Sequence, residues 1–127
     1  MIYLSSQDIV LMHDFMIEHR WWLSGNNNIG QLESVLSHIK NDIYYPDMLE
    51  KITHLFFSLV QFHMFNDGNK RTAIVASETF LFINNYVIED FIIKMEDIAV
   101  WVAKWEIDKW TLEKIFSSMF ISFWYLK

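Results

Sequence analysis

Apolar residues recur along this chain at the three- and four-residue spacing of helices that bury one face. The longest run keeps this period as far as His63 and consists of Met48, Ile52, Leu55, Phe56, Leu59 and Val60. The pattern stops at Asn66-Asp67-Gly68-Asn69, then resumes with Ile74 and continues to about Asn84. We therefore expect two long helices, the first starting near Asp47, joined by a very short polar loop.

Shorter runs predict helices before this pair. A first helix should begin at Ser5 or Ser6, because a serine hydroxyl accepts a hydrogen bond from a free amide of the first turn. Its apolar stripe consists of Ile9, Met12, Phe15 and Met16, and it should end before the polar loop at 24–28. A second helix after Gly30 carries Leu32, Val35, Leu36 and Ile39 on one face.

The rest of the chain has a weaker pattern. Ile43-Tyr44-Tyr45, before the lone Pro46, is a candidate for a short extended piece. We expect brief β-branched stretches at 86–88 and 91–93, followed by a helix near 95–104. Asp108 should cap a last helix whose apolar face consists of Leu112, Ile115, Phe116 and Met119.

Composition narrows the fold class. Of the 127 residues 53% are hydrophobic, whereas only three are glycine and one is proline. This composition is typical of a folded helical protein and not of a disordered chain. We expect one all-α domain over residues 1–127, a compact bundle of about six helices.

Charge and cysteine content exclude several functions. The net charge of −6 argues against a general nucleic-acid binder, which needs a basic surface to neutralise phosphates. Without cysteine, disulfides and thiolate chemistry are excluded. The start lacks the features of a signal peptide, and the apolar stretch at 115–126 is shorter than the roughly 20 residues of a membrane helix. We expect a soluble, cytoplasmic protein without a membrane partner.

The segment from His63 to Arg71 concentrates the candidate chemistry. Gly68 allows a tight turn, and the helix after it presents free amides that favour an anion, with Lys70 and Arg71 in its first turn. Asp67 offers the oxygen ligand that Mg²⁺ takes beside phosphates, and His63 can accept a proton near neutral pH. An ordinary turn rich in asparagine and aspartate would look the same, so these residues alone leave a phosphate site as one of two interpretations.

This segment resembles the signature of the Fic/Doc family, His-x-Phe-x-Asp/Glu-Gly/Ala-Asn-x-Arg, and its Asn69-Lys70-Arg71 resembles the Doc (death on curing) toxin branch. Further stretches at 11–14, 30–36 and 82–85 are similar to Doc segments, so the resemblance extends over nearly the whole chain. It implies the helical Fic/Doc fold, and it leaves open a short β-hairpin flap at Tyr44 to Pro46 that docks a target.

The resemblance also implies site residues. His63 would be the general base for a hydroxyl of a target protein, and Asp67 would hold Mg²⁺. The ATP site would consist of Phe65, Gly68, Asn69, Lys70 and Arg71. In that site Phe65 would be buried and pin the loop, the next two residues would line the phosphate cradle, and the two cations would contact phosphates.

Three departures from the Fic pattern affect the expected reaction. Met64 replaces a common proline, Lys70 replaces a glycine, and Ile74 stands where a second arginine is usual. The last two follow the Doc branch, in which a reversed nucleotide exposes its γ-phosphate. We therefore expect a kinase that phosphorylates a serine, threonine or tyrosine, with AMP transfer and an inactive binding module as the alternatives.

The resemblance finally implies a toxin with two protein partners. The target would be elongation factor Tu, so that phosphorylation inhibits translation. The chain lacks the self-inhibitory Fic motif, so an antitoxin would act in trans. The aromatic residues near the two ends could line a groove for it, but they would more commonly be core residues; they are Trp21, Trp22, Trp101, Trp105, Trp110, Phe123, Trp124 and Tyr125.

Other histidines offer weaker candidates. The pair His13-Asp14 lacks the further metal ligands of a phosphohydrolase, and we interpret it as helix surface. Glu50 with His54, and His38 with Asp42, are spaced as i, i+4 pairs, which are usually surface contacts.

Overall fold

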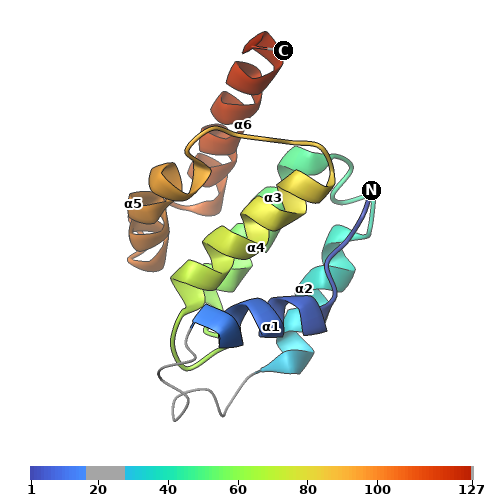
Figure 1. Ribbon diagram of the computed structural model, residues 1–127, viewed down its shortest axis with the longest axis vertical. Helices are drawn as coiled ribbons and strands as arrows, with labels where there is room; N and C mark the ends of the chain where they lie inside the picture. The colour runs from blue at the N-terminus through green and yellow to red at the C-terminus, as the bar shows by residue number, and fades with distance from the viewer. Residues whose placement is uncertain (17–27, 127) are drawn as a thin grey trace.

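The computed structural model describes residues 1–16 and 28–126, and this part of the chain consists of helices joined by short loops (Figure 1). The six helices are α1 (Ser6–Met16), α2 (Ile29–Ile39), α3 (Met48–Gln61), α4 (Asn69–Ile83), α5 (Phe91–Ala103) and α6 (Lys109–Leu126). No strand occurs within the described residues. The all-α expectation is therefore confirmed. In this part of the chain no helix combines the length and the hydrophobicity needed to cross a bilayer.

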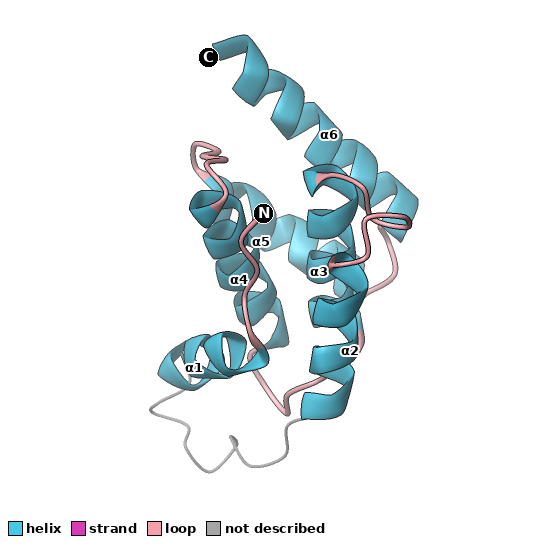
Figure 2. Ribbon diagram, turned by 90° about the vertical axis from the view of Figure 1, so that its right-hand side faces the viewer, coloured by secondary structure: helices cyan, strands magenta, loops and turns pink. Residues whose placement is uncertain are grey.

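Helix α3 is the centre of the structure. It packs against α2, α4, α5 and α6, while α1 lies across α4 and also contacts α2 (Figure 2). Its position explains its sequence, because a helix enclosed by neighbours must be apolar on most of its faces. The core around it contains four fully buried phenylalanines, namely Phe56, Phe80, Phe91 and Phe116.

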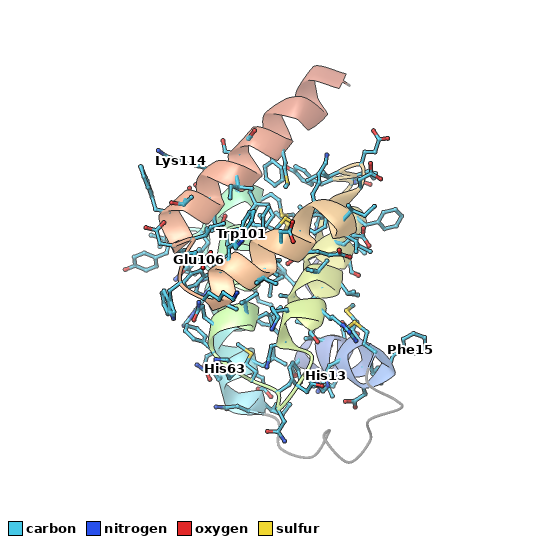
Figure 3. All side chains as sticks on the ribbon, turned by 90° about the vertical axis from the view of Figure 1, so that its left-hand side faces the viewer. His13, Phe15, His63, Trp101, Glu106 and Lys114 are labelled. Carbon is cyan, nitrogen blue, oxygen red and sulfur yellow. The ribbon has the colours of Figure 1, made fainter. Side chains whose placement is uncertain are left out.

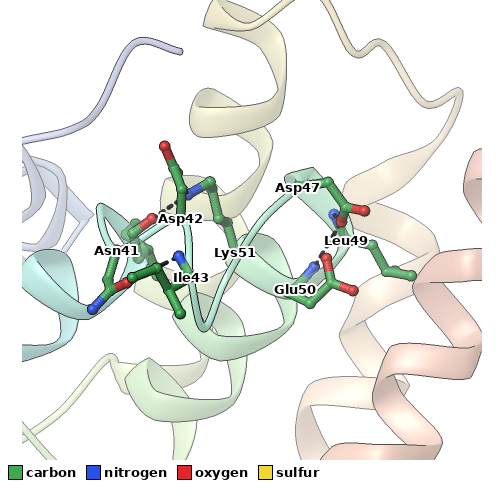
Figure 4. A network of polar contacts seen from close by, with 8 residues as sticks. Asn41, Asp42, Ile43, Asp47, Leu49, Glu50 and Lys51 are labelled. Carbon is green, nitrogen blue, oxygen red and sulfur yellow. Dashed lines mark hydrogen bonds and ion pairs between the residues drawn. The ribbon is translucent and has the colours of Figure 1, made fainter.

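The predicted faces of α2 and α3 and the predicted cap of α6 are confirmed. The stripes expected on α2 and α3 are buried throughout, as are Leu112 and Phe116 on α6. Asp47 caps α3, accepting hydrogen bonds from the amides of Leu49 and Glu50 (Figure 4). Asp108 caps α6 through the Thr111 amide. At the start of α1, Ser5 and Asp8 each accept a hydrogen bond from the other's backbone amide.

Three local predictions were wrong. Residues 91–93 form the first turn of α5 and not an extended stretch, because Phe91 and Met95 are buried one turn apart. Ile43-Tyr44-Tyr45 is a turn, in which the Tyr45 amide donates to the carbonyl of Asn41. Phe15 is 76% exposed and does not belong to the buried stripe of α1. The loop expected at 24–28 lies outside the described residues, except for Asn28.

A buried lysine ties the loop after α2 to α3. The Lys51 side chain is almost fully buried, and its ammonium donates to the carbonyl of Ile39 and to Asp42, whose Oδ1 lies 2.7 Å away (Figure 4). Asp42 therefore pairs with Lys51. The expected pair of His38 with Asp42 was wrong.

A second polar cluster connects α2, α3 and α6 through His54. The Lys109 ammonium, which can only donate, lies 2.8 Å from His54 Nδ1, so this nitrogen accepts. The hydrogen of the neutral ring is then on Nε2, which donates to His38 Nδ1 at 3.1 Å. His54 is buried, so the expectation of a surface pair with Glu50 was wrong.

This cluster predicts a pH-dependent stability. Burial, the Lys109 charge and His38 lower the pKa of His54 from 6.5 to about 4. Between these values the unfolded chain binds a proton that the folded protein does not, so stability falls as the pH falls through this window. Allowing for solvent around the cluster, we expect about 1–2 kcal/mol of loss from this group.

Urea unfolding of the wild type and of His54→Gln between pH 7 and pH 4 measures this loss. Glutamine keeps a donor and an acceptor but does not titrate, so its stability should depend less on pH by that amount. Identical pH profiles for the two proteins would contradict the assignment.

Candidate functional site

The loop predicted to carry the chemistry joins α3 to α4. Helix α3 ends at Gln61 with Phe62 as its cap, and His63 follows with a φ of 47°, in the left-handed region that a histidine rarely adopts. This backbone turns the chain away from the helix axis and leaves the His63 side chain exposed (Figure 3). At the other end of the loop, Gly68 has a φ of 79° and precedes the first turn of α4, as its lack of a side chain allows.

Asn69 closes the loop on itself. Its Oδ1 accepts a hydrogen bond from the Phe65 amide at 3.1 Å, and its Nδ2 donates to the Phe65 carbonyl at 2.8 Å. One side chain thus satisfies both backbone groups of a residue four positions earlier. Phe65 itself is 3% exposed, so the prediction of a buried phenylalanine that pins the loop agrees with its position.

His13 contacts the same loop from α1. Its Nε2 lies 2.7 Å from the backbone oxygen of Asp67, and its ring stacks on Phe65 with centroids 3.9 Å apart and planes 12° apart. The side chain is fully buried. Our interpretation of His13 as helix surface was therefore wrong, although its neighbour Asp14 is about half exposed.

The start of α2 provides another contact. The Asn28 amide donates to the Met64 carbonyl at 2.7 Å, and the Met64 side chain is buried in the core. Met64 stands where many Fic proteins have proline. A buried side chain and a backbone hydrogen bond hold the position that a proline ring would otherwise stiffen.

The two cations of the motif lie exposed in the first turn of α4. Lys70 and Arg71 border a cavity of about 480 Å³ that is otherwise lined mainly by apolar residues of α4 and α5. Glu96 contributes an acidic group to its wall, and Ile74, at the position of the second Fic arginine, contributes a largely buried apolar side chain. The volume is that of a small-molecule pocket, with positive charge at one edge.

Asp67 is the candidate metal ligand, and it is half-buried within the loop. No group of three or more histidine, aspartate or glutamate side chains suited to a metal ion occurs in residues 1–16 and 28–126. Mg²⁺ in phosphate sites is commonly held by one or two carboxylates together with the phosphates, and a single aspartate fits that arrangement.

The predicted site residues lie on one loop and on the helix turn that follows it. The sequence analysis did not predict the contacts that His13 and Asn28 make with this loop. A signal for His13 existed, because it lies four residues after the buried Ile9, on the inward face of its helix. The hydrogen bond of the Asn28 amide joins two backbone groups far apart in sequence, so the residue pattern gave no signal for it.

The structure describes only some of the aromatic residues that were candidates for a groove or for the core. Trp101, Trp105 and Trp110 are all exposed, and Trp105 packs edge-to-face on Phe57 with ring centroids 5.8 Å apart. Trp21 and Trp22 lie outside the described residues, as do the side chains of Phe123, Trp124 and Tyr125.

Two comparisons with known proteins gave matches to this chain. The chain is similar to protein kinase doc of Escherichia phage P1, with 29% identity over 110 residues that cover 84% of this chain and 86% of the phage protein. The model of the Fic/DOC family matches residues 3–81, which include α1 to α3, the loop and most of α4. Since the match extends over more than half of the chain, this protein belongs to the Fic/Doc family.

Proposed function

We propose that this protein is a Doc-type kinase that transfers the γ-phosphate of ATP to a hydroxyl side chain of another protein. The proposal rests on the loop between α3 and α4, which the hydrogen bonds of the Asn69 side chain hold closed. The exposed His63 lies at one end of this loop, and the exposed Lys70 and Arg71 lie at the other. The similarity to a protein named as a kinase supports the same reaction.

In this proposal His63 acts as the general base. The target hydroxyl oxygen attacks the γ-phosphorus, its proton passes to the imidazole, and the bond to the β-phosphate breaks to release ADP. Lys70 and Arg71 neutralise the phosphates, and the backbone amides at the start of α4, after Gly68, donate hydrogen bonds to phosphate oxygens. Phe65 and Asn69 keep the loop in shape for this nucleotide.

Mg²⁺ would be held by Asp67 together with the nucleotide phosphates, and it would supply charge neutralisation at the transferred group. The neighbouring cavity would hold a further part of the nucleotide. Its mainly apolar lining suits a planar base or a sugar better than a phosphate.

The residues at two positions favour transfer of the γ-phosphate over transfer of AMP. Lys70 has a side chain where Fic proteins need the close backbone approach of glycine, and Ile74 provides no charge for a further phosphate contact. A nucleotide bound in the Fic orientation would lose both interactions.

Incubation with ATP labelled in either the α- or the γ-phosphate, with a bacterial lysate as the source of targets, tests the proposal. We expect label on protein from γ-labelled ATP only, and none when EDTA removes divalent cations. Protein labelled from the α-phosphate would instead establish AMP transfer. Without label from either, and with normal growth on expression, the chain would be an inactive binding module.

We also infer that the protein is a toxin whose target is a translation factor, with elongation factor Tu as the first candidate to test in purified form. An antitoxin in trans would restrain it. The exposed Trp101, Trp105 and Trp110 offer apolar surface of the kind that marks a partner site.

A further inference from the structure

We propose that His13 is a positioning residue for the reaction, because it fixes the backbone of the loop that carries His63 and Asp67. The proposal rests on the proposed function for its catalytic consequence, whereas the positioning of the loop can be measured without it. His13 lies on α1, 54 residues before the backbone group that it contacts.

The first step of the argument is the direction of the hydrogen bond. The backbone oxygen of Asp67 can only accept, so His13 Nε2, at 2.7 Å, must carry a hydrogen and donate it. On the other side of the ring, Nδ1 lies 3.1 Å from Oδ1 of Asp14. The hydrogen bond from Nε2 and the stacking on Phe65 hold the ring in one orientation.

The second step is the packing. The His13 ring is fully buried and stacks on Phe65, the residue that Asn69 binds through both of its backbone groups. One side chain thus packs against one loop residue and bonds to another. An aliphatic residue would fill this space without needing a partner, so the polar ring is suited to hold the Asp67 carbonyl.

The third step relates this contact to the chemistry. The fixed carbonyl belongs to the candidate metal ligand and adjoins Gly68, whose left-handed backbone leads into the anion-binding turn. A displacement of about 1 Å at a reacting group lowers rates by as much as 10²-fold. We expect a smaller effect from a single lost hydrogen bond, of about tenfold.

Two substitutions separate the donor from the packing. His13→Phe keeps an aromatic ring on Phe65 but removes the donor, and we expect it to fold normally. Its loop peptide, residues 64–69, should exchange amide hydrogen for deuterium faster than in the wild type. Its kcat for γ-phosphate transfer should fall about tenfold, with a smaller change in KM for ATP. His13→Gln keeps a donor without the ring and should recover most of the kcat.

Leu11→Ala, at an exposed position of the same helix, is the control and should leave loop exchange and kcat unchanged. Wild-type exchange and wild-type kcat in His13→Phe would overturn the proposal, and so would a kcat that falls in His13→Gln but not in His13→Phe. If the wild type itself transfers no phosphate, the proposed function fails, and the exchange of the loop alone then decides whether His13 positions it.

Discussion

Replacing His63 by alanine is expected to lower the rate of γ-phosphate transfer by about 10²- to 10⁴-fold, the range typical of a lost general base. Because the side chain is exposed, its removal leaves the core intact, and the free energy of unfolding should change by less than about 0.5 kcal/mol. Initial rates with γ-labelled ATP, and urea unfolding of the same preparations, measure the two effects separately.

A second substitution controls for the backbone at this position. His63 has a positive φ, which asparagine tolerates better than alanine does. His63→Asn also lacks a group that titrates near neutral pH, so we expect it to be as inactive as the alanine variant while keeping the turn. Phosphate transfer at the wild-type rate in either variant would show that another group takes the proton.

Replacing Phe116 by alanine is expected to lower the free energy of unfolding by about 3–5 kcal/mol, as for other buried phenylalanines. The ring is fully buried on α6, edge-to-face with Phe56 of α3 at 5.8 Å and stacked on Phe91 of α5 at 6.3 Å. Its loss leaves a cavity where three helices meet. A domain at the lower end of the usual stability range, with about 5 kcal/mol in total, would then be close to unfolding at 37 °C.

The control for this prediction is the same change at an exposed position. Phe82 on α4 is 65% exposed, so Phe82→Ala should change the unfolding free energy by no more than about 0.5 kcal/mol. Guanidinium unfolding followed by circular dichroism gives both values. Equal losses in the two variants would mean that the three-helix contact at Phe116 contributes little to stability.

The central helix pair could be predicted from the sequence because its signals are local. A long helical period and a glycine between two helices each act within a few residues, and both match the structure from Asp47 to Asn84. Phe91 shows the opposite case. Isoleucines at 92 and 93 favoured an extended stretch, but burial of one helical face on α3 and α4 prevailed over their local preference.

The buried polar contacts could not be predicted, because their partners are distant in sequence. The His13 ring forms a hydrogen bond with a backbone oxygen 54 positions away, and His54 accepts one from a lysine 55 positions away. Spacing along one helix suggested a surface pair for His54, and His13 was interpreted as helix surface. Only the packing of α1 on α4, and of α6 on α3, brings these groups together.

The loop and the cavity beside it depend on different parts of the chain. Among the described residues, the loop is fastened by His13 of α1, Asn28 before α2 and Asn69 of α4, whereas the far wall of the cavity belongs to α5. Changes at Ile92 or Val100 can therefore reshape what the cavity admits without loosening the loop. Related proteins could therefore catalyse the same reaction and still accept different molecules, because substitutions confined to α5 would change the cavity alone.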